Sequence, residues 1–304
     1  VLLSQISRFC VPMFIVLSGY GLAASEAKRD VGDWSWEETK IFWSRRGQRI
    51  VLPYLFWSAL TMAYMGRLTN QGGGIDWSGI GVALVTGQAD YHLYFIAFLL
   101  QGYLLWPLLR RPTWWLVVAL VLTQVYFASP THIFHPDRLS VPGWAFIHWA
   151  GYFTLGAKLY ALPNVDERSA ALPRFIWVLC GAFVLIEYQF WAERQSNPGW
   201  FNHFSRYVVI AYALSTAWLW RRSASKLTDW LERSGAGTFV THGSGLTFCV
   251  YFIHVWALRM LDPLGLGFLA KLIIVMTIVF AVSWILERSL TGKWSKWPRR
   301  CFGL

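Results

Sequence analysis

The chain has 304 residues, of which 56% are hydrophobic, 14% are charged and 20 are tryptophans. This composition is more apolar and less charged than that of an ordinary soluble domain, so it favours a protein embedded in a membrane. The net charge of +11 does not indicate nucleic-acid binding, because the Lys and Arg residues are dispersed among the connections between apolar segments and form no single patch.

Nine apolar segments follow one another along the chain, with lengths suited to crossing a hydrocarbon core of about 30 Å. We predict an all-α, polytopic membrane helical bundle that forms one domain over residues 1–304, because a bundle offers no internal boundary where contacts become sparse. The predicted spans are Phe9–Ala24, Ile50–Met65, His92–Leu109, Thr113–Ser129, Gly143–Tyr160, Phe175–Ala192, Tyr207–Trp220, Gly245–Leu261 and Phe268–Leu286.

The Lys and Arg residues predict how this bundle is oriented. When a residue at a span end is counted with its nearer connection, 20 of the 27 fall on one side of the membrane and 7 on the other. Basic residues accumulate on the cytoplasmic side of spans. We therefore expect the tail Arg288–Leu304 and the long connections Ser25–Arg49 and Arg221–Ser244 to be cytoplasmic, and Val1 to lie outside the cell membrane.

A basic run lies at the cytoplasmic end of the second predicted span. Its members Arg45, Arg46 and Arg49, called the arginine trio below, have spacings of three and four residues, which in an α-helix put Arg49 on the same face as both others. Clustered guanidinium groups suit a multiply charged phosphate ligand, because each can give paired hydrogen bonds to its oxygens. Positive-inside anchoring or contact with anionic lipid explains the same run without a ligand.

Four ionisable residues interrupt the predicted spans, where such groups are costly and usually face a cavity or a partner. They are His92, His148, Glu187 and His254. With the orientation above, all four could share one outward-facing cavity, in which imidazoles transfer protons and the carboxylate orients them or acts as a base. For His148 and Glu187 the alternative is a hydrogen bond that joins two helices.

The four cysteines, Cys10, Cys180, Cys249 and Cys301, stand singly in the sequence. They form no CxxC pair and have no companion His at ligand spacing, so we expect neither a disulfide nor a metal site. The chain also begins with Val1 almost inside an apolar segment and shows no signal peptide, and we expect that residues upstream are missing.

Five sequence segments occur in the order typical of one membrane protein family. They are ISRFCVPMFIVLSGYGLA from Ile6, WSRRGQRIVLPYLFW from Trp43, YHLYFIAFLLQGYLLWPLL from Tyr91, YFTLGAKL from Tyr152 and VYFIHVWAL from Val250. Together they resemble the acyltransferase 3 family of integral membrane acyltransferases, many of which O-acylate cell-surface glycans. One departure is Tyr94, where the family usually has Trp.

The resemblance implies an O-acyltransferase that moves an acyl group, most simply acetyl, from cytoplasmic acyl-coenzyme A to a hydroxyl of a cell-surface or lipid-linked sugar. Acyl-coenzyme A would be a co-substrate, with no bound cofactor, and the other partners would be the sugar acceptor and the lipid bilayer. The arginine trio would hold the nucleotide phosphates, and His92 and His254 would be the candidate catalytic residues that line the acceptor pocket.

Three further residues would position the substrate or stabilise a developing oxyanion, namely Arg8, Ser18 and Glu187. A covalent acyl carrier at Ser18 is an alternative role. The simpler explanation of the Ser18-Gly19 pair is a turn of small residues that brings two helices close together.

The family's most characteristic catalytic feature is an arginine and a histidine on a first helix, upstream of the Ser-Gly-aromatic segment. This chain shows no such helix, so we expect a ten-helix family member whose first helix, with the principal catalytic histidine, precedes Val1. The alternatives are a chain that has lost activity, or one in which His92 or His254 has taken over the role.

Two other classes of function fit the same features. A transporter or flippase of a glycan or lipid-linked sugar would also need a cavity with intramembrane His and Glu, and the glycine-rich segment Gly72–Gly87 could then be re-entrant. A structural subunit of an envelope-building complex is the third possibility.

Overall fold

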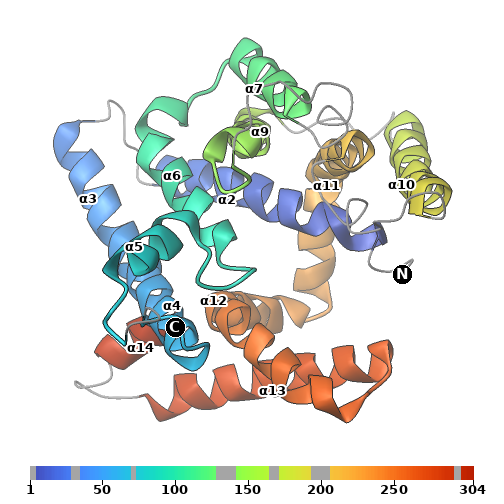
Figure 1. Ribbon diagram of the computed structural model, residues 1–304. Helices are drawn as coiled ribbons and strands as arrows, with labels where there is room; N and C mark the ends of the chain where they lie inside the picture. Colours follow the sequence, from blue (N-terminus) through green and yellow to red (C-terminus); the bar gives the residue numbers. More distant parts are fainter. Residues whose placement is uncertain are drawn as a thin grey trace. The chain divides into compact units, whose positions relative to one another are not determined.

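The computed structural model describes residues 5–28, 35–69, 73–127, 142–163, 171–192, 206–290 and 296–304. Every named element in these ranges is a helix, and the only strand-like pairing among them is an isolated bridge between Thr69 and Ile75. The predicted all-α fold is confirmed for this part of the protein (Figure 1).

Long apolar helices account for part of the predicted membrane crossings. Four helical segments within the described residues are long and apolar enough to span a bilayer, and three shorter apolar helices accompany them. The long segments are Ser7–Ala27, Ala171–Phe190, Ala236–Leu264 and Phe268–Ser289, and the shorter ones are Trp77–Thr86, Tyr94–Leu109 and Trp114–Tyr126. The full count of nine spans stays a prediction.

Contacts divide the chain into two compact units, each made from two stretches of sequence. Unit 1 comprises Val1–Ser35 and Gln101–Leu227, and unit 2 comprises Trp36–Leu100 and Thr228–Leu304. Two helices belong partly to each unit. Helix α6 (Tyr94–Leu109) crosses the boundary after Leu100, and helix α11 (Tyr207–Arg233) crosses the boundary after Leu227.

In unit 2, helix α12 is the central element. It packs along α13, while α14 packs against α4 (Figure 1). The helices of this unit, besides the parts of α6 and α11, are α3 (Trp36–Arg46), α4 (Leu52–Tyr64), α5 (Trp77–Thr86), α12 (Ala236–Leu261), α13 (Phe268–Ser289) and α14 (Lys296–Phe302). Trp57 of α4 lies parallel to Phe252 of α12, with 6.0 Å between ring centroids, and so joins these two helices.

The region Arg221–Ser244, which we predicted as a loop between two spans, is almost entirely helical. Helix α11 continues to Arg233 and α12 begins at Ala236, so only Ser234 and Gly235 separate them, with Gly235 in the left-handed region at φ 71°. The sequence looks like a loop because it is polar, but its Arg, Lys, Leu, Glu and Ala residues are strong helix formers. The long connection Ser25–Arg49 also contains a helix, α3, and so does the glycine-rich segment Gly72–Gly87, which contains α5.

A π-helical turn, η2 (Gly47–Val51), joins α3 to α4. Pro53 follows it and has no N–H, and in an α-helix its ring would clash with the carbonyl of Arg49 four residues earlier. A π turn, whose hydrogen bonds run from residue i to i+5, widens the helix at this point. The position of Arg49 around the helix axis relative to Arg45 and Arg46 therefore differs from the one that we assumed for a regular α-helix.

Unit 1 is built around the contact between α2 and α9, and α7 packs on the other side of α9 (Figure 1). Its helices are α2 (Cys10–Ala27), α7 (Trp114–Tyr126), α9 (Ala150–Ala161) and α10 (Ala171–Ala192), together with part of α6, most of α11 and the short turns η1 (Ser7–Phe9) and η3 (Phe146–His148). The predicted span Gly143–Tyr160 is therefore a 3-10 turn followed by a shorter helix.

Two glycines let the backbones of α2 and α9 touch. A Cβ atom built on Gly19 would lie 2.0 Å from the carbonyl oxygen of Phe153, and one built on Gly156 would lie 1.9 Å from that of Val16. Both distances are far below van der Waals contact, so no side chain fits at either position. The structure thus places Ser18-Gly19 in mid-helix rather than in a turn, with Gly19 at a helix contact of the small-residue type.

We predict that Gly19→Ala lowers the free energy of unfolding by about 1–3 kcal/mol, because α2 and α9 must move apart to admit the methyl group. Gly21→Ala in the same helix is the matched control, since a Cβ there meets nothing within 4 Å and alanine is the better helix former. Unfolding of the purified protein in detergent measures both variants. Equal stability of the two would refute the tight contact.

Candidate functional site

A tight turn between α5 and α6 carries two of the side chains of interest. Helix α5 ends at Thr86, and the next residue, Gly87, has a φ of 73° in the left-handed region. A Cβ built on Gly87 would lie 2.3 Å from the Cα of Tyr94. Glycine therefore lets the chain fold back onto the start of α6. The backbone N–H of Leu93 donates to the carbonyl of Asp90 at 3.1 Å, which closes the turn that includes His92.

Asp90 is a buried carboxylate, with 1% of its side chain exposed. Its Oδ1 accepts hydrogen bonds from Arg259 Nη2 of α12 at 2.7 Å and from its neighbour's backbone N–H at 2.8 Å, while its Oδ2 lies 3.7 Å from His92 Nδ1. Burial alone would raise the pKa of Asp90, but the adjacent His92 and Arg259 outweigh it and lower that pKa to about 2. The carboxylate is therefore ionised.

His92 projects into the same cluster and is 8% exposed. Neither of its ring nitrogens has a hydrogen-bond partner among the described residues, and its ring centroid lies 5.3 Å from those of both Tyr251 and His254. The Tyr251 hydroxyl donates a hydrogen bond to the backbone carbonyl of His92. This bond and the Asp90–Arg259 ion pair hold the turn against α12.

His254 comes from α12, three residues after Tyr251. Its Nδ1 lies 2.5 Å from the backbone carbonyl oxygen of Tyr251. Because a carbonyl can only accept, this contact assigns the proton to Nδ1 and leaves the lone pair of Nε2 available to accept a proton. His254 therefore has the tautomer that a general base needs.

The structure thus brings His92 and His254 together from two separate elements of unit 2, with a buried carboxylate and a guanidinium beside them. Such an arrangement can take a proton from a hydroxyl and stabilise the charged imidazole that results. We call Asp90, His92, Tyr251, His254 and Arg259 the histidine cluster. Among the residues that the structure describes, no three His, Cys, Asp or Glu side chains form a metal-binding group.

Sequence reasoning missed Asp90 and Arg259. Each lies at the edge of a predicted span, where we counted charged residues as parts of the connections. A signal was present, because Asp90 precedes His92 by two residues and Arg259 follows His254 by five. An acidic and a basic residue beside two intramembrane histidines could have been singled out as candidates, although no local pattern predicts that they pair.

The arginine trio lies at the junction of α3 and the π turn. Arg45 and Arg49 are exposed, and among the described residues neither has an ion-pair or hydrogen-bond partner. Arg46 is half-buried and stacks over the ring of Phe42 at 5.7 Å. Two of the three guanidinium groups are therefore presented outward without a carboxylate from the described part of the protein.

The remaining candidates belong to unit 1. Glu187 accepts from Arg206 Nη1 at 2.9 Å, and Arg206 Nη2 donates to Gln5 at 2.7 Å. Arg206 is 1% exposed, so this ion pair links α10 to the start of α11 within the unit. Arg206 is another residue that the sequence analysis did not identify.

Arg8 and Ser18 lie near the start and in the middle of the first long helical segment. Arg8 belongs to turn η1, and its positive charge acts on that of Arg206. The Ser18 hydroxyl donates to the carbonyl of Phe14 at 2.7 Å, a bond within the helix. His148, the fourth intramembrane candidate, lies in turn η3 with its ring 5.4 Å from that of Phe127.

We predict that Arg259→Leu destabilises the protein by roughly 3–5 kcal/mol, because it leaves the buried Asp90 carboxylate without its cation. The double variant Asp90→Asn/Arg259→Leu should recover part of that loss, since the uncompensated charge is gone. Unfolding in detergent measures both. A single variant as stable as the parent protein would contradict the pairing.

The lowered pKa of Asp90 also predicts a pH dependence. A carboxyl group whose pKa is lower in the folded protein stabilises the fold above its ordinary value of 3.8, and the stabilisation is lost as the pH falls towards about 2. The thermal midpoint of the protein should therefore fall more steeply between pH 4 and 2 than that of Asp90→Asn. Parallel curves for the two proteins would show that Asp90 does not titrate in this way.

Comparison with known families accounts for the motifs. A family model described as an acyltransferase domain matches residues 1–288, in both units. No curated protein and no solved structure matches the chain. The resemblance inferred from the five segments is confirmed, and with its apolar helices the chain belongs to the acyltransferase 3 family of membrane acyltransferases.

Proposed function

We propose that this protein transfers an acyl group, most simply acetyl, from cytoplasmic acyl-coenzyme A to a hydroxyl of a cell-surface or lipid-linked sugar in the cell membrane. Membership of the acyltransferase 3 family supports acyl transfer in general. The observation that carries the finer proposal is the contact between His92 and His254 beside the ionised Asp90.

His254 is the proposed general base. Its Nε2 takes the proton of the acceptor hydroxyl while the hydroxyl oxygen attacks the thioester carbonyl carbon. A C–O bond forms, the C–S bond breaks, and the sulfur of coenzyme A leaves and receives the proton back from the imidazolium. The product is an O-acyl ester, and no oxidant or metal is needed for the balance.

His92 and Asp90 support that step. The Asp90 carboxylate lies 3.7 Å from His92 Nδ1, and the proposed role of His92 is to donate a hydrogen bond from Nε2 to the developing oxyanion. Arg259 holds the carboxylate in place through its 2.7 Å hydrogen bond. In this scheme Asp90 and Arg259 are positioning residues, while the two histidines contact the substrate.

The arginine trio is proposed to bind the phosphates of acyl-coenzyme A on the cytoplasmic side. The exposure of Arg45 and Arg49 and their lack of a partner among the described residues support this role, because a phosphate would then be their counterion. In unit 1, Glu187 is proposed to orient Arg206, and Ser18 is proposed to have a role in helix packing.

We expect His254→Gln to lower kcat for acyl transfer by about 10²–10⁴-fold, because the amide keeps roughly the size of the ring but cannot accept the proton. Transfer of labelled acetyl from acetyl-coenzyme A to glycan in membranes gives the rate, and binding of acetyl-coenzyme A should stay unchanged. His242→Gln is the control, since that histidine pairs with Glu287 outside the histidine cluster. A His254→Gln protein with the parent rate would refute the assignment.

The double variant Arg45→Ala/Arg49→Ala should weaken binding of acyl-coenzyme A by about tenfold or more and leave kcat unchanged, because each charge-assisted hydrogen bond contributes about 1.5–3 kcal/mol. Binding to the purified protein in detergent measures this. Arg233→Ala, which removes an exposed arginine at the end of α11, is the matched control. Unchanged binding together with lost movement of sugar across vesicles would instead support a transporter.

A further inference from the structure

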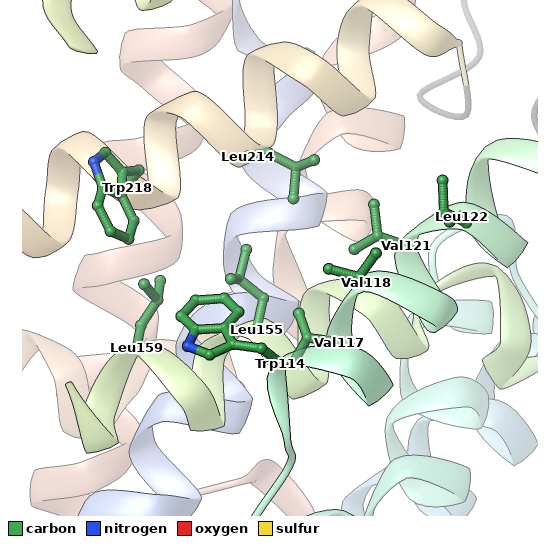
Figure 2. A pocket seen from close by; sticks show the side chains of 9 residues that line it. All are labelled: Trp114, Val117, Val118, Val121, Leu122, Leu155, Leu159, Leu214 and Trp218. Carbon is green, nitrogen blue, oxygen red and sulfur yellow. The ribbon is translucent and has the colours of Figure 1, made fainter.

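An apolar groove runs along unit 1 between α7, α9 and α11 (Figure 2). Its volume is about 310 Å³, and every side chain that lines it is apolar or a tryptophan. Each helix forms one wall of the groove, for example through Val118 of α7, Leu155 of α9 and Leu214 of α11. The groove belongs to unit 1 and the histidine cluster to unit 2, so a ligand in the groove is independent of the proposed function.

The two ends of the groove differ. Trp114 and Trp218 lie at one end with Leu159, and Val121 and Leu122 lie at the other (Figure 2). Along α7, the rise from Trp114 to Leu122 is about 12 Å. Tryptophan is most stable at the boundary between hydrocarbon and headgroups. The tryptophan end is therefore the end nearest the membrane surface, and the cytoplasmic one in the orientation that we expect.

Two cations lie at this same end. Lys158 Nζ is 5.6 Å from the ring centroid of Trp114, and the guanidinium carbon of Arg222 is 5.8 Å from that of Trp218. Both side chains therefore extend over the indole rings that close the groove. The two side chains place positive charge at the tryptophan end of the groove.

The neighbouring charges do not neutralise Lys158. Glu26, a carboxylate at the end of α2, is already bound by Arg110, and Lys158 has no carboxylate partner among the described residues. Arg221 donates hydrogen bonds to the carbonyl oxygens of Leu159 and Leu162 at 2.9 Å, so its guanidinium caps the C-terminal end of α9. The positive charge of Lys158 therefore remains at the tryptophan end without a carboxylate from the described residues.

We propose that the groove is a binding site for one anionic phospholipid of the bilayer. One acyl chain lies between α7, α9 and α11, and the phosphate of the headgroup contacts Lys158 and Arg222. Basic pockets between membrane helices recognise anionic headgroups, whereas the phosphate of a zwitterionic lipid is already compensated by the cation of its own headgroup. The groove has no polar wall for a sugar or a peptide, which leaves a hydrocarbon chain as the occupant that fits.

The test uses the full chain in detergent, exposed to equal amounts of phosphatidylglycerol and phosphatidylcholine, with bound lipid counted by native mass spectrometry. The parent protein should retain phosphatidylglycerol preferentially. Lys158→Gln should reduce that preference about fivefold, the effect of about one basic residue near an anionic headgroup. Leu214→Trp, which fills the groove, should lose the retained lipid of either kind.

Two controls separate this site from the general lipid surface. Lys40→Gln removes an exposed lysine of unit 2, and Leu179→Trp enlarges an exposed leucine of α10, so neither should change the retained lipid. Thermal unfolding confirms that each variant is folded. If Leu214→Trp fails to fold, Val118→Trp replaces it, because Val118 lies on a more exposed wall of the groove. Equal retention of both lipids by the parent protein, or an unchanged preference in Lys158→Gln, would overturn the proposal.

Discussion

The ion pair between Asp90 and Arg259 is the interaction on which the histidine cluster depends. A carboxylate with 1% exposure would be very costly without a cation and hydrogen bonds, and here it has both. The pair joins the turn before α6 to α12, and the Tyr251 hydroxyl adds a second link to the carbonyl of His92. The contact between the two imidazoles results from these links, since neither ring of the pair holds the other by a hydrogen bond.

The same principle organises unit 1, where buried charges are also paired. Glu187 meets Arg206, and Glu26 meets Arg110. In a protein whose long helices are apolar, such pairs keep ionised groups without exposing them to hydrocarbon, and they fix helices that apolar surfaces alone would leave free to slide. The glycine contact of α2 and α9 has a complementary role, because it joins helices through backbone atoms alone.

Periodicity and composition predict the helical fold well, because an apolar segment of suitable length in this composition has no alternative to a helix. They fail for the region Arg221–Ser244, since polarity alone does not distinguish a loop from a helix that leaves the apolar layer. The proximity of His92 and His254 was expected both from the orientation of the predicted spans and from the motifs. Asp90 and Arg259 are 169 residues apart in sequence, so their pairing is a tertiary contact that no local pattern contains.

The π turn at Gly47–Val51 has a consequence for how this segment tolerates changes in length. Each residue of an α-helix turns the chain by about 100°, and a π turn accommodates one residue more in each hydrogen-bonded loop. Loss of a single residue there would restore a regular helix and leave Arg45 and Arg46 on the side that they now occupy, while the chain after Leu52 stayed in place. A deletion within the π turn should thus be tolerated, whereas a deletion within the regular helix α3 would rotate the residues before it by about 100° relative to α4.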